Sequence, residues 1–490
     1  MRRHASPHLF RTGRSSPGGQ SPLGRAAVLC ALVATAGAGV SAGRLGAQNT
    51  AIVGATVLDG TGAEPVSDGV VLVVEGRIAC VGTAGDCPVP PGAERVDASG
   101  RWVVPGLIDA HVHYSQTGWA DGRPDALDVR DRFPYERTVE WLEENPDLLG
   151  QAYLCSGVTA TFDVGGYPWT WGLRRWSDTS TTMPHIEAAG PLLSTIDHWL
   201  NLPAERQFLH IANDSSVTVG ADYLVANGTS AVKVWFLVGS QVDTAALRTL
   251  MERAGARARD AGIPLIVHAT GLWDAKVAVA NGASLLVHSV EDTLVDGEFL
   301  DLARDAGTIY TPTLVVFDGY LQLATRAFDP GPYGDLLGCV DPTSLEKAQL
   351  TDSLPGGLTP DRADAYRTRR EEGAATMAAN LRRIRDAGIP IATGTDAGNP
   401  LTLHGPAIFL EMEAMAAAGL TPMEVLISST AVAARAMGRG ADLGTLEPGK
   451  VADLVILDAD PLADVRNLRR IHAVMRGGSL VPHDRLRFRP

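Results

Sequence analysis

The chain has 490 residues, of which 45% are hydrophobic and 20% are charged, so it is globular and long enough to bury one large core or two. Its formal net charge is −14. Six of the 42 basic residues and none of the 56 acidic residues fall within residues 1–47, which leaves the rest with 36 basic residues and a net charge of −20. This large negative charge on residues 48–490 argues against nucleic acid or an anionic membrane surface as the main partner.

The N-terminal segment has the pattern of an export signal. An arginine-rich stretch precedes the apolar run AAVLCALVATAGAGV (26–40), and Leu45-Gly46-Ala47 fits a loose A-x-A cleavage site. The run is too short to span a bilayer comfortably. We therefore expect residues 1–47 to be a signal peptide and the mature protein to be periplasmic or secreted, without a membrane anchor after cleavage. The alternatives are a disordered tail or a start codon assigned too early.

Four cysteines remain after such a cleavage, namely Cys80, Cys87, Cys155 and Cys339. Cys80 and Cys87 flank the turn-like stretch VGTAGD, and an exported protein could form a disulfide there. Two free buried thiols are the alternative. None of the four cysteines has the spacing of metal ligands.

Two β-rich segments flank a different middle. Residues 48–104 contain short apolar stretches separated by Gly, Pro and Asp, and residues 441–485 show the same alternation of apolar stretches and turn-forming residues. Because chain ends commonly meet in space, this pattern predicts one small composite β-sandwich built from both segments.

The middle of the chain, residues 105–440, alternates short β-branched runs with helical patterns. The eight runs are LIDAHVH (107–113), VTATFDVG (158–165), HIEAAG (185–190), AVKVWFLV (231–238), PLIVHAT (264–270), LLVHSV (285–290), IYTPTLVV (309–316) and PIATGTDAG (390–398). The helical stretches 251–262 and 377–388 both end in a glycine that suits a C-cap. Eight such units predict an α/β fold, a (β/α)₈ TIM barrel. An open doubly wound sheet is the runner-up, but no G-x-G-x-x-G follows a first strand.

A long excursion separates the seventh and eighth predicted strands. Residues 318–375 are rich in Asp, Gly and Pro and contain Cys339. Long loops on the catalytic face of a barrel often cover the site, so we expect a lid-like insertion there.

Nitrogen and oxygen donors recur at the ends of five predicted strands. The set is His111, His113, Lys233, His268, His288 and Asp396. His111 and His113 are two residues apart, so both project to one face of a strand. Taken singly, such residues have ordinary explanations as a hydrogen-bonded core histidine, an ion-paired lysine or a helix-capping aspartate. Together, at the strand ends where barrel enzymes build their sites, they predict a metal centre, since zinc takes imidazole and carboxylate ligands.

With these residues in place, the sequence resembles the amidohydrolase superfamily, metal-dependent hydrolases on a (β/α)₈ barrel with a flanking β-sandwich. The resemblance covers about residues 50–485. Beyond the strand-end residues, it rests on PGLIDAHVH (105–113), TGTDAG (393–398), LGTLEPGKVADLVILDADPL (443–462) and VMRGG (474–478). The stretches GTDAG…HG (394–405) and EMEAMAAAGLTPMEVLISST (411–430) are typical of the branch with imidazolonepropionase-like and carboxylated-lysine prolidase-like proteins.

The resemblance implies a role for each ligand. His111 and His113 would bind the more buried of two zinc ions and share it with Asp396, and His268 and His288 would bind the second. Lys233 would carry a carbamate, as N6-carboxylysine, that bridges the two ions. Another divalent metal would fit the same ligands. If Lys233 is unmodified, the site would hold a single ion.

The resemblance also implies a reaction. A water held between two cations has a lowered pKa and attacks a carbonyl carbon, while Asp396 takes its proton and passes it to the leaving nitrogen. We therefore expect an exported amidohydrolase that cleaves the amide or peptide C–N bond of a small molecule such as a dipeptide or an N-acyl amino acid. Two alternatives stay open: the same centre acting on a lactone, a phosphotriester or a deamination substrate, and a metal-binding protein without turnover. A homo-oligomer is compatible with the sequence.

Four residues are candidates for substrate contact. Trp235 stands where many dipeptidase-like relatives have a small-residue loop, so it would change the pocket wall. Tyr167 could add a hydrophobic surface, and Arg174 could clamp a carboxylate, although packing of the loop and pairing with surface acids are the alternatives, the latter favoured for the arginine. His404 follows the Asp396 loop and would either contact substrate or hold the loop by a hydrogen bond.

Overall fold

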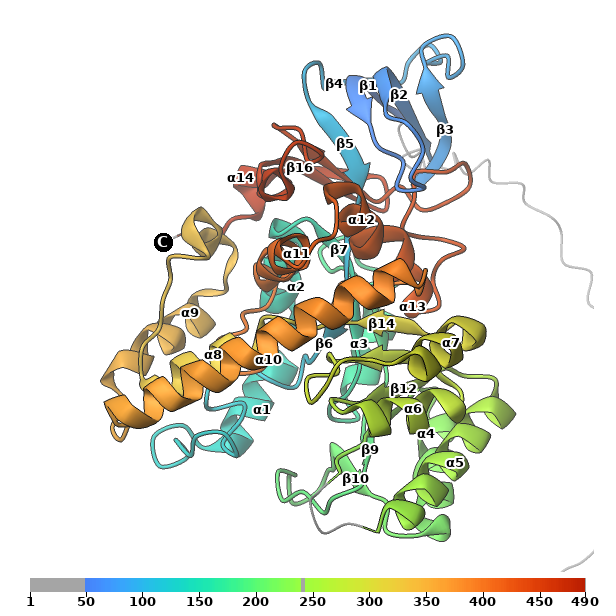
Figure 1. Ribbon diagram of the computed structural model, residues 1–490. Helices are drawn as coiled ribbons and strands as arrows, with labels where there is room; N and C mark the ends of the chain where they lie inside the picture. The colour runs from blue at the N-terminus through green and yellow to red at the C-terminus, as the bar shows by residue number, and fades with distance from the viewer. Residues whose placement is uncertain (1–48, 239–242, 490) are drawn as a thin grey trace, which may run out of the picture. The chain divides into compact units, whose positions relative to one another are not determined.

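A computed structural model describes residues 49–238 and 243–489 of the chain (Figure 1). The predicted signal peptide, residues 1–47, lies outside the described residues, and export stays a prediction. Across the described ranges, the helices include none that is both long enough and apolar enough to cross a bilayer.

Both ends of the described chain build one mixed sheet of eight strands, drawn in blue and red in Figure 1. Its order is β17-β16-β15-β5-β1-β2-β3, with β4 paired to β1. The strands are β1 (Thr50–Val57), β2 (Val66–Val74), β3 (Arg77–Thr83), β4 (Glu94–Asp97), β5 (Trp102–Pro105), β15 (Leu454–Leu457), β16 (Ile471–Arg476) and β17 (Ser479–Pro482). Alternate residues from both ends, among them Ile52, Val71, Val103, Ile456 and Met475, share one buried core. The predicted β-sandwich of both chain ends is therefore present.

The middle of the chain forms two parallel sheets. One has the order β6-β7-β8 and the other the order β10-β9-β11-β12-β13-β14. The strands are β6 (Leu107–Val112), β7 (Val158–Asp163), β8 (His185–Ala188), β9 (Leu192–Ser194), β10 (Phe208–His210), β11 (Val232–Trp235), β12 (Leu265–His268), β13 (Ala283–Val287) and β14 (Ile309–Thr311). Seven of the eight predicted strands are among them. The short strands β9 and β10 were not predicted, because three residues are too few to show a period.

The eighth predicted strand is an extended segment rather than a full ladder partner. Within residues 390–397, Ile391 makes an isolated parallel bridge to β14 and Ala397 makes one to β6. Asp396, between them, has a left-handed backbone with φ 61° that breaks regular pairing. On the opposite side, β8 and β11 share no ladder. The prediction of a closed barrel is therefore confirmed only in part: the α/β fold with parallel strands is present, but the strands do not close into a complete ring.

The helices follow the predicted spacing. They are α1 (Tyr135–Glu144), α2 (Pro146–Cys155), α3 (Thr170–Ser177), α4 (Asp214–Ala226), α5 (Thr244–Ala261), α6 (Leu272–Ala280), α7 (Gly297–Ala306), α8 (Val316–Thr325), α9 (Pro342–Gln349), α10 (Pro360–Asp386), α11 (Ala407–Ala417), α12 (Pro422–Ile427), α13 (Ala433–Ala436) and α14 (His483–Leu486). Four short turns complete the set: η1 (Gly334–Cys339), η2 (Leu350–Ser353), η3 (Ser428–Val432) and η4 (Val465–Arg469). As predicted, α5 ends at Gly262, whose φ of 67° is the left-handed C-cap that glycine favours.

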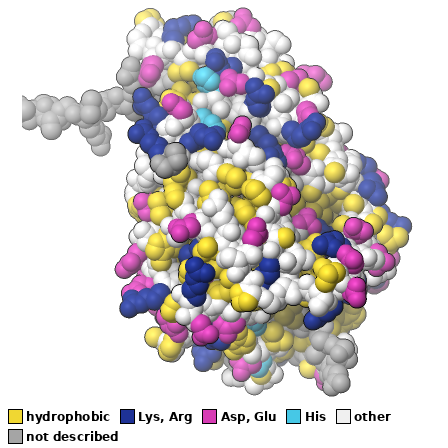
Figure 2. All heavy atoms as spheres, turned by 90° about the vertical axis from the view of Figure 1, so that its left-hand side faces the viewer, with side chains coloured by type: hydrophobic (Ala, Val, Ile, Leu, Met, Phe, Trp, Pro, Cys, Tyr) yellow, Lys and Arg dark blue, Asp and Glu magenta, His cyan; other side chains and the backbone are white. Residues whose placement is uncertain are grey.

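The predicted insertion, residues 318–375, holds most of α8, then η1, α9 and η2, and the first part of α10. Figure 2 shows the side of the molecule that this region faces, where acidic and basic side chains are interspersed with hydrophobic ones.

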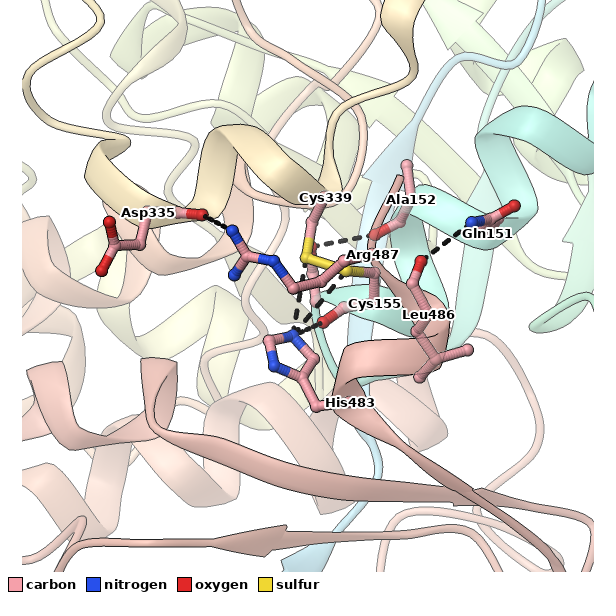
Figure 3. Close-up of a disulfide and its surroundings, with 9 residues drawn as sticks. Gln151, Ala152, Cys155, Asp335, Cys339, His483, Leu486 and Arg487 are labelled. Atoms are coloured by element: carbon pink, nitrogen blue, oxygen red, sulfur yellow. Dashed lines mark hydrogen bonds between the residues drawn. A yellow bond between two sulfur atoms is a disulfide. The ribbon is translucent and has the colours of Figure 1, made fainter. Parts of the chain in front are cut away.

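Two disulfide bonds cross-link the described chain. Cys80–Cys87 is the one that the sequence predicted, with the Cα atoms 5.7 Å apart. Cys155–Cys339 was not predicted, and it joins the end of α2 to η1 of the insertion (Figure 3). His483 of α14 lies against this disulfide and donates from Nε2 to the Cys155 carbonyl at 3.0 Å. The insertion, the barrel-like middle and the C-terminal segment are thus tied together at one point.

A buried carboxyl joins α11 to the segment after β14. The oxygens of Glu411 accept the Leu314 N–H at 2.9 and 2.8 Å and the Val315 N–H at 3.1 Å. These two amides follow Thr313, which has a left-handed backbone with φ 48°. Burial raises the pKa of Glu411 to about 8, although the two N–H groups act in the opposite direction.

Loss of the Cys155–Cys339 disulfide should destabilise the protein more than loss of Cys80–Cys87. The two bridges close loops between cysteines 184 and 7 residues apart. Because the entropy that a cross-link removes from the unfolded chain grows with loop length, the longer loop is worth about 2–3 kcal/mol more. Denaturant unfolding of the paired Cys→Ala variants tests this, and an equal loss from both pairs would contradict it.

The stability of the protein should depend on pH through Glu411. Its pKa is raised in the folded state, so its contribution is complete below the ordinary glutamate pKa and is lost as the pH rises through about 8. Glu411→Gln cannot ionise and should therefore flatten the decline of the unfolding free energy between about pH 5 and 8, a decline of at most about 1.4 kcal/mol per pH unit from one group. Urea titrations of both proteins at several pH values measure the difference. Parallel pH profiles would rule out this role.

Candidate metal centre and its cavity

The end of β6 and the segment 390–397 bring three predicted ligands together. His111 Nε2 lies 3.2 Å and His113 Nε2 lies 2.9 Å from the same oxygen, Asp396 Oδ1. All three side chains are buried, with at most 8% of any residue exposed. The i and i+2 spacing of the histidines on one strand places both rings on the same face, as predicted.

Hydrogen bonds behind the rings decide which atoms face Asp396. His113 Nδ1 lies 2.6 Å from the Gly165 carbonyl, and a carbonyl only accepts, so this nitrogen carries the proton. In the neutral ring, Nε2 then presents a lone pair toward Asp396. His111 Nε2 and Asp396 Oδ1 are both buried without a hydrogen-bond partner. Two ring nitrogens and a carboxylate oxygen that converge in a buried site, two of these atoms without a hydrogen-bond partner, form a donor set that fits a divalent metal.

The charges of these groups support the same reading. Burial lowers the pKa of His111 well below its usual value, which keeps the ring neutral and able to bind a metal. Burial alone would raise the pKa of Asp396, but His111 and His113 hold it well below the usual range. The site therefore offers the neutral ring of His111 and the carboxylate of Asp396, with the His113 ring beside them.

The other three predicted ligands face the same space. The ring centres of His268 and His288 are 4.3 Å apart, and His288 Nε2 lies 3.8 Å from Asp396 Oδ2. Lys233 on β11 is only 2% exposed, and burial lowers its pKa to about 7. No carboxylate of the described chain comes within ion-pair distance of its amine. All six side chains border one cavity, and the role of each as a ligand stays a prediction.

The backbone is strained at this site. His288 and Asp396 have φ of 76° and 61°, a region that residues other than glycine rarely occupy. Thr313, with φ 48°, sets its hydroxyl 3.2 Å from His111 Nδ1. Such conformations cost energy and persist where the surroundings enforce them, which is common at functional sites.

The cavity has a volume of about 260 Å³ and two unlike walls. The apolar wall consists of Leu192, Phe208, Trp235, Val316 and Phe317. The polar wall consists of Gln116, Arg123, Tyr320, Tyr366 and Asn399. Tyr320 and Tyr366 belong to the predicted insertion, so this region does contribute to the cavity.

Of the four predicted substrate contacts, the structure places only Trp235 in the cavity wall. Tyr167 is buried behind it, with its hydroxyl 3.1 Å from that of Tyr135. Arg174 Nε lies 2.9 Å from Glu187 outside the cavity, which is the acid pairing given as the alternative. His404 accepts from Tyr153 at 2.8 Å and donates to the Gln116 carbonyl at 2.8 Å.

The bonds of His404 match its alternative interpretation, a histidine that holds a loop. Both of its ring nitrogens are used, which leaves none for a substrate.

Sequence reasoning missed the polar wall. Arg123 and Gln116 lie in the irregular loop after β6, and Asn399 follows the eighth strand segment. Irregular loops have no period from which a side-chain direction can be predicted. The one available signal was position, since loops that follow the strands of a barrel form its catalytic face.

Comparison with known proteins gives the site its context. A family model described as "Amidohydrolase family" matches residues 102–481. An imidazolonepropionase of Caulobacter vibrioides is 26% identical over 426 residues, which cover 82% of this chain and 90% of that protein. A 5-methylthioadenosine/S-adenosylhomocysteine deaminase of Symbiobacterium thermophilum is 25% identical over 447 residues, covering 84% and 86%.

A solved structure has the same fold. A Xaa-Pro dipeptidase with methionine bound in its active site superposes with a TM-score of 0.67 at 21% identity, over 89% of this chain and all of that one. The family match spans most of the described residues and contains every strand-end ligand discussed above. With its His-His-Asp cluster, the chain therefore belongs to the amidohydrolase family and is a metal-dependent hydrolase.

Proposed function

We propose that this protein is a zinc-dependent hydrolase that cleaves the amide or peptide C–N bond of a small molecule, such as an N-acyl amino acid or a dipeptide. The observation that carries the proposal is the convergence of the Nε2 atoms of His111 and His113 on one oxygen of Asp396, beside a cavity of about 260 Å³ that all three residues line. A cavity of that size suits a small substrate rather than a polymer.

Each residue of the site would have its own role in the proposed reaction. A divalent cation held there would lower the pKa of water and polarise a carbonyl oxygen. Asp396 would accept the proton of the attacking water and deliver it to the leaving nitrogen, a role that its deprotonated state and its position beside His111 and His113 support. The Gly165 carbonyl accepts from Nδ1 of His113 and so directs its Nε2 to the metal, and the Thr313 hydroxyl holds the His111 ring through a hydrogen bond at Nδ1.

We further propose that Lys233 is carboxylated and that the site holds two ions. An amine reacts with carbon dioxide in its neutral form, releasing a proton as the carbamate forms. Burial lowers the pKa of Lys233 to about 7, so much of the amine is neutral near neutral pH. The carbamate would supply an anion to His268 and His288, which otherwise have only Asp396 nearby.

Two further expectations belong to this proposal. We propose that the protein is exported, which the two disulfides support because such bonds persist in oxidising compartments.

Deamination is the second candidate reaction, since a relative that is 25% identical is named a deaminase. Both reactions use the same centre, and the substrate decides between them.

Hydrolysis tests the function directly. Amide substrates, Xaa-Pro dipeptides, lactones, a phosphotriester and aminopurine nucleosides should be offered to zinc-loaded protein, with release of amine, acid and ammonia followed separately. We expect turnover of amides or dipeptides that is lost after dialysis against a chelator and restored by zinc. Turnover of another class alone, or none, would overturn the proposal.

Lys233→Ala should lower the metal content. The wild type should hold about two zinc ions, as expected for a bridged site, and the variant about one or fewer because the bridge is gone. Elemental analysis by mass spectrometry measures this. Lys276→Ala is the control, since Lys276 pairs with Asp296 and Glu298 on the surface and should change nothing. Unchanged zinc in the Lys233 variant would rule out the carbamate bridge.

Asp396→Asn should lower kcat by about 10²–10⁴-fold, because the amide cannot take the proton of the attacking water. Steady-state kinetics at matched zinc content separates this effect from loss of metal. Asp458→Asn is the control, since Asp458 pairs with Arg101 in the β-sandwich. A kcat within a few-fold of the wild type would show that Asp396 is not the proton carrier.

A further inference from the structure

A half-buried guanidinium, that of Arg123, stands in the wall of the cavity and has no part in the chemistry described so far. Apart from Lys233, Arg123 is the only basic side chain, lysine or arginine, among the described residues that border the cavity. Its side chain is 16% exposed, and the exposed part faces this space. A cation set into such a wall is costly unless it has partners, so its contacts are informative.

The contacts of Arg123 fix its position relative to the metal site. Asp125 accepts from Nε and Nη2, both at 2.8 Å. Asn399 Oδ1 accepts from Nη1 and also from the Tyr320 hydroxyl. The Asn399 amide donates to the backbone carbonyl of Asp396 at 3.1 Å. The Asn399 side chain therefore connects the Arg123 guanidinium to Asp396, the residue proposed to transfer the proton to the leaving nitrogen.

These contacts leave part of the guanidinium free. An arginine carries five N–H groups, and the three contacts above use one on each nitrogen. One N–H therefore remains on each terminal nitrogen, the pair of atoms that binds a carboxylate in a fork. Asp125 occupies the edge formed by Nε and Nη2, so it does not block a second anion from the terminal nitrogens.

A second polar group on the same wall also lacks a partner. Gln116 is 7% exposed and borders the cavity, and its Oε1 is buried without a hydrogen bond. Rotation of the amide would present its NH₂ group instead. A buried amide oxygen without a hydrogen-bond partner, on a residue that lines the cavity, makes Gln116 a second candidate for a ligand contact.

We propose that Arg123, assisted by Gln116, binds the carboxylate of the substrate and makes the enzyme selective for amides whose leaving amine is an α-amino acid. This inference rests on the proposed function. The reaction would be R–CO–NH–CHR′–COO⁻ + H₂O → R–COO⁻ + ⁺H₃N–CHR′–COO⁻. The link from Arg123 through Asn399 to Asp396 sets the carboxylate on the side of the leaving nitrogen. The apolar wall, with Phe208, Trp235 and Phe317, suits an aromatic side chain or acyl group.

The competing interpretation is structural. Arg123 also joins the loop after β6 to α8 through Tyr320 and to the loop that carries Asn399, so a variant could lose activity simply because these loops separate. The decisive measurement is therefore the preference between two substrates rather than the rate on one.

The test uses N-benzoyl-L-phenylalanine and its carboxamide, which share the scissile bond and differ only in the carboxylate. Release of benzoate from zinc-loaded, full-length mature protein is measured for both. We expect kcat/KM to favour the carboxylate by about 10²-fold, as one charge-assisted fork supplies. In the double variant Arg123→Gln with Asp125→Asn, which leaves no unpaired buried charge, the preference should fall to within a few-fold of unity, mainly through KM.

Two further variants keep the result clear. Arg123→Lys retains the charge but not the fork and should keep part of the preference. Arg174→Gln removes an arginine that is also paired with a carboxylate, but outside the cavity, and should leave the preference unchanged. Thermal unfolding shows whether each variant is folded.

The outcomes separate the two proposals. If the wild type hydrolyses both substrates equally, or the double variant slows on both while keeping its preference, Arg123 is a structural contact and the inference is wrong. If the wild type hydrolyses neither, the proposed function fails for this class, and calorimetric binding of the same pair decides about Arg123. A carboxylate preference in binding that the double variant loses would support the site, and equal binding would overturn it.

Discussion

The structure of the site depends on the close approach of two strand segments that are far apart in the sequence. Asp109, on β6, accepts from the Thr395 hydroxyl at 2.6 Å and from the Thr395 N–H at 3.0 Å. It also accepts the N–H of His111 at 3.2 Å. One buried carboxyl thus fixes the residue before Asp396 and one of the histidines that face it. This side chain adds to three backbone hydrogen bonds between the two segments, which run from the Ala110 N–H to the Thr393 carbonyl, from the Asp396 N–H to the His111 carbonyl and from the His113 N–H to the Ala397 carbonyl.

Polar groups behind His111 and His113 hold these two ligands in a similar way. The Gly165 carbonyl orients His113 and the Thr313 hydroxyl orients His111. Thr313 is in turn followed by the two amides that Glu411 binds from α11. His111, His113 and the residue before Asp396 are therefore held by groups outside the ligands themselves. The bonds from Asp109 to Thr395 help to keep the strained backbone of Asp396 in place.

How much of this could be predicted depends on whether a residue belongs to a periodic segment. His111, His113 and Lys233 were predicted correctly to share a cavity because alternation along a strand fixes the direction of a side chain. The strands β9 and β10 were missed because they are three residues long. The Cys155–Cys339 disulfide was missed because a pairing over 184 residues leaves no local pattern.

The residues that line the cavity were even harder to predict from the sequence. Arg174 was singled out because it follows aromatic residues in the segment after the second predicted strand, yet it pairs with Glu187 outside the cavity. Arg123, in an irregular loop, has the position that Arg174 was expected to have. Only the folded loops decide which of two arginines faces the cavity, and neither composition nor charge distinguishes them. His404 is similar, since its two hydrogen-bond partners come from α2 and from the loop after β6.

The disulfide in the insertion bears on the cavity even though it lies outside the cavity wall. Tyr320 and Tyr366 reach the cavity from α8 and α10, and the chain between these helices holds η1, α9 and η2. A segment of that length would cost considerable conformational entropy to hold against the barrel by side-chain contacts alone. The Cys155–Cys339 bond anchors it near its middle, and the Tyr333 hydroxyl adds a bond to the Leu401 carbonyl at 2.9 Å. Leu401 lies in the same loop as Asn399, so the Tyr333 contact of the insertion and the polar contacts of Arg123 meet in one short stretch of chain. The wall of the cavity on this side therefore depends on how the insertion is anchored, by the disulfide as well as by packing and hydrogen bonds.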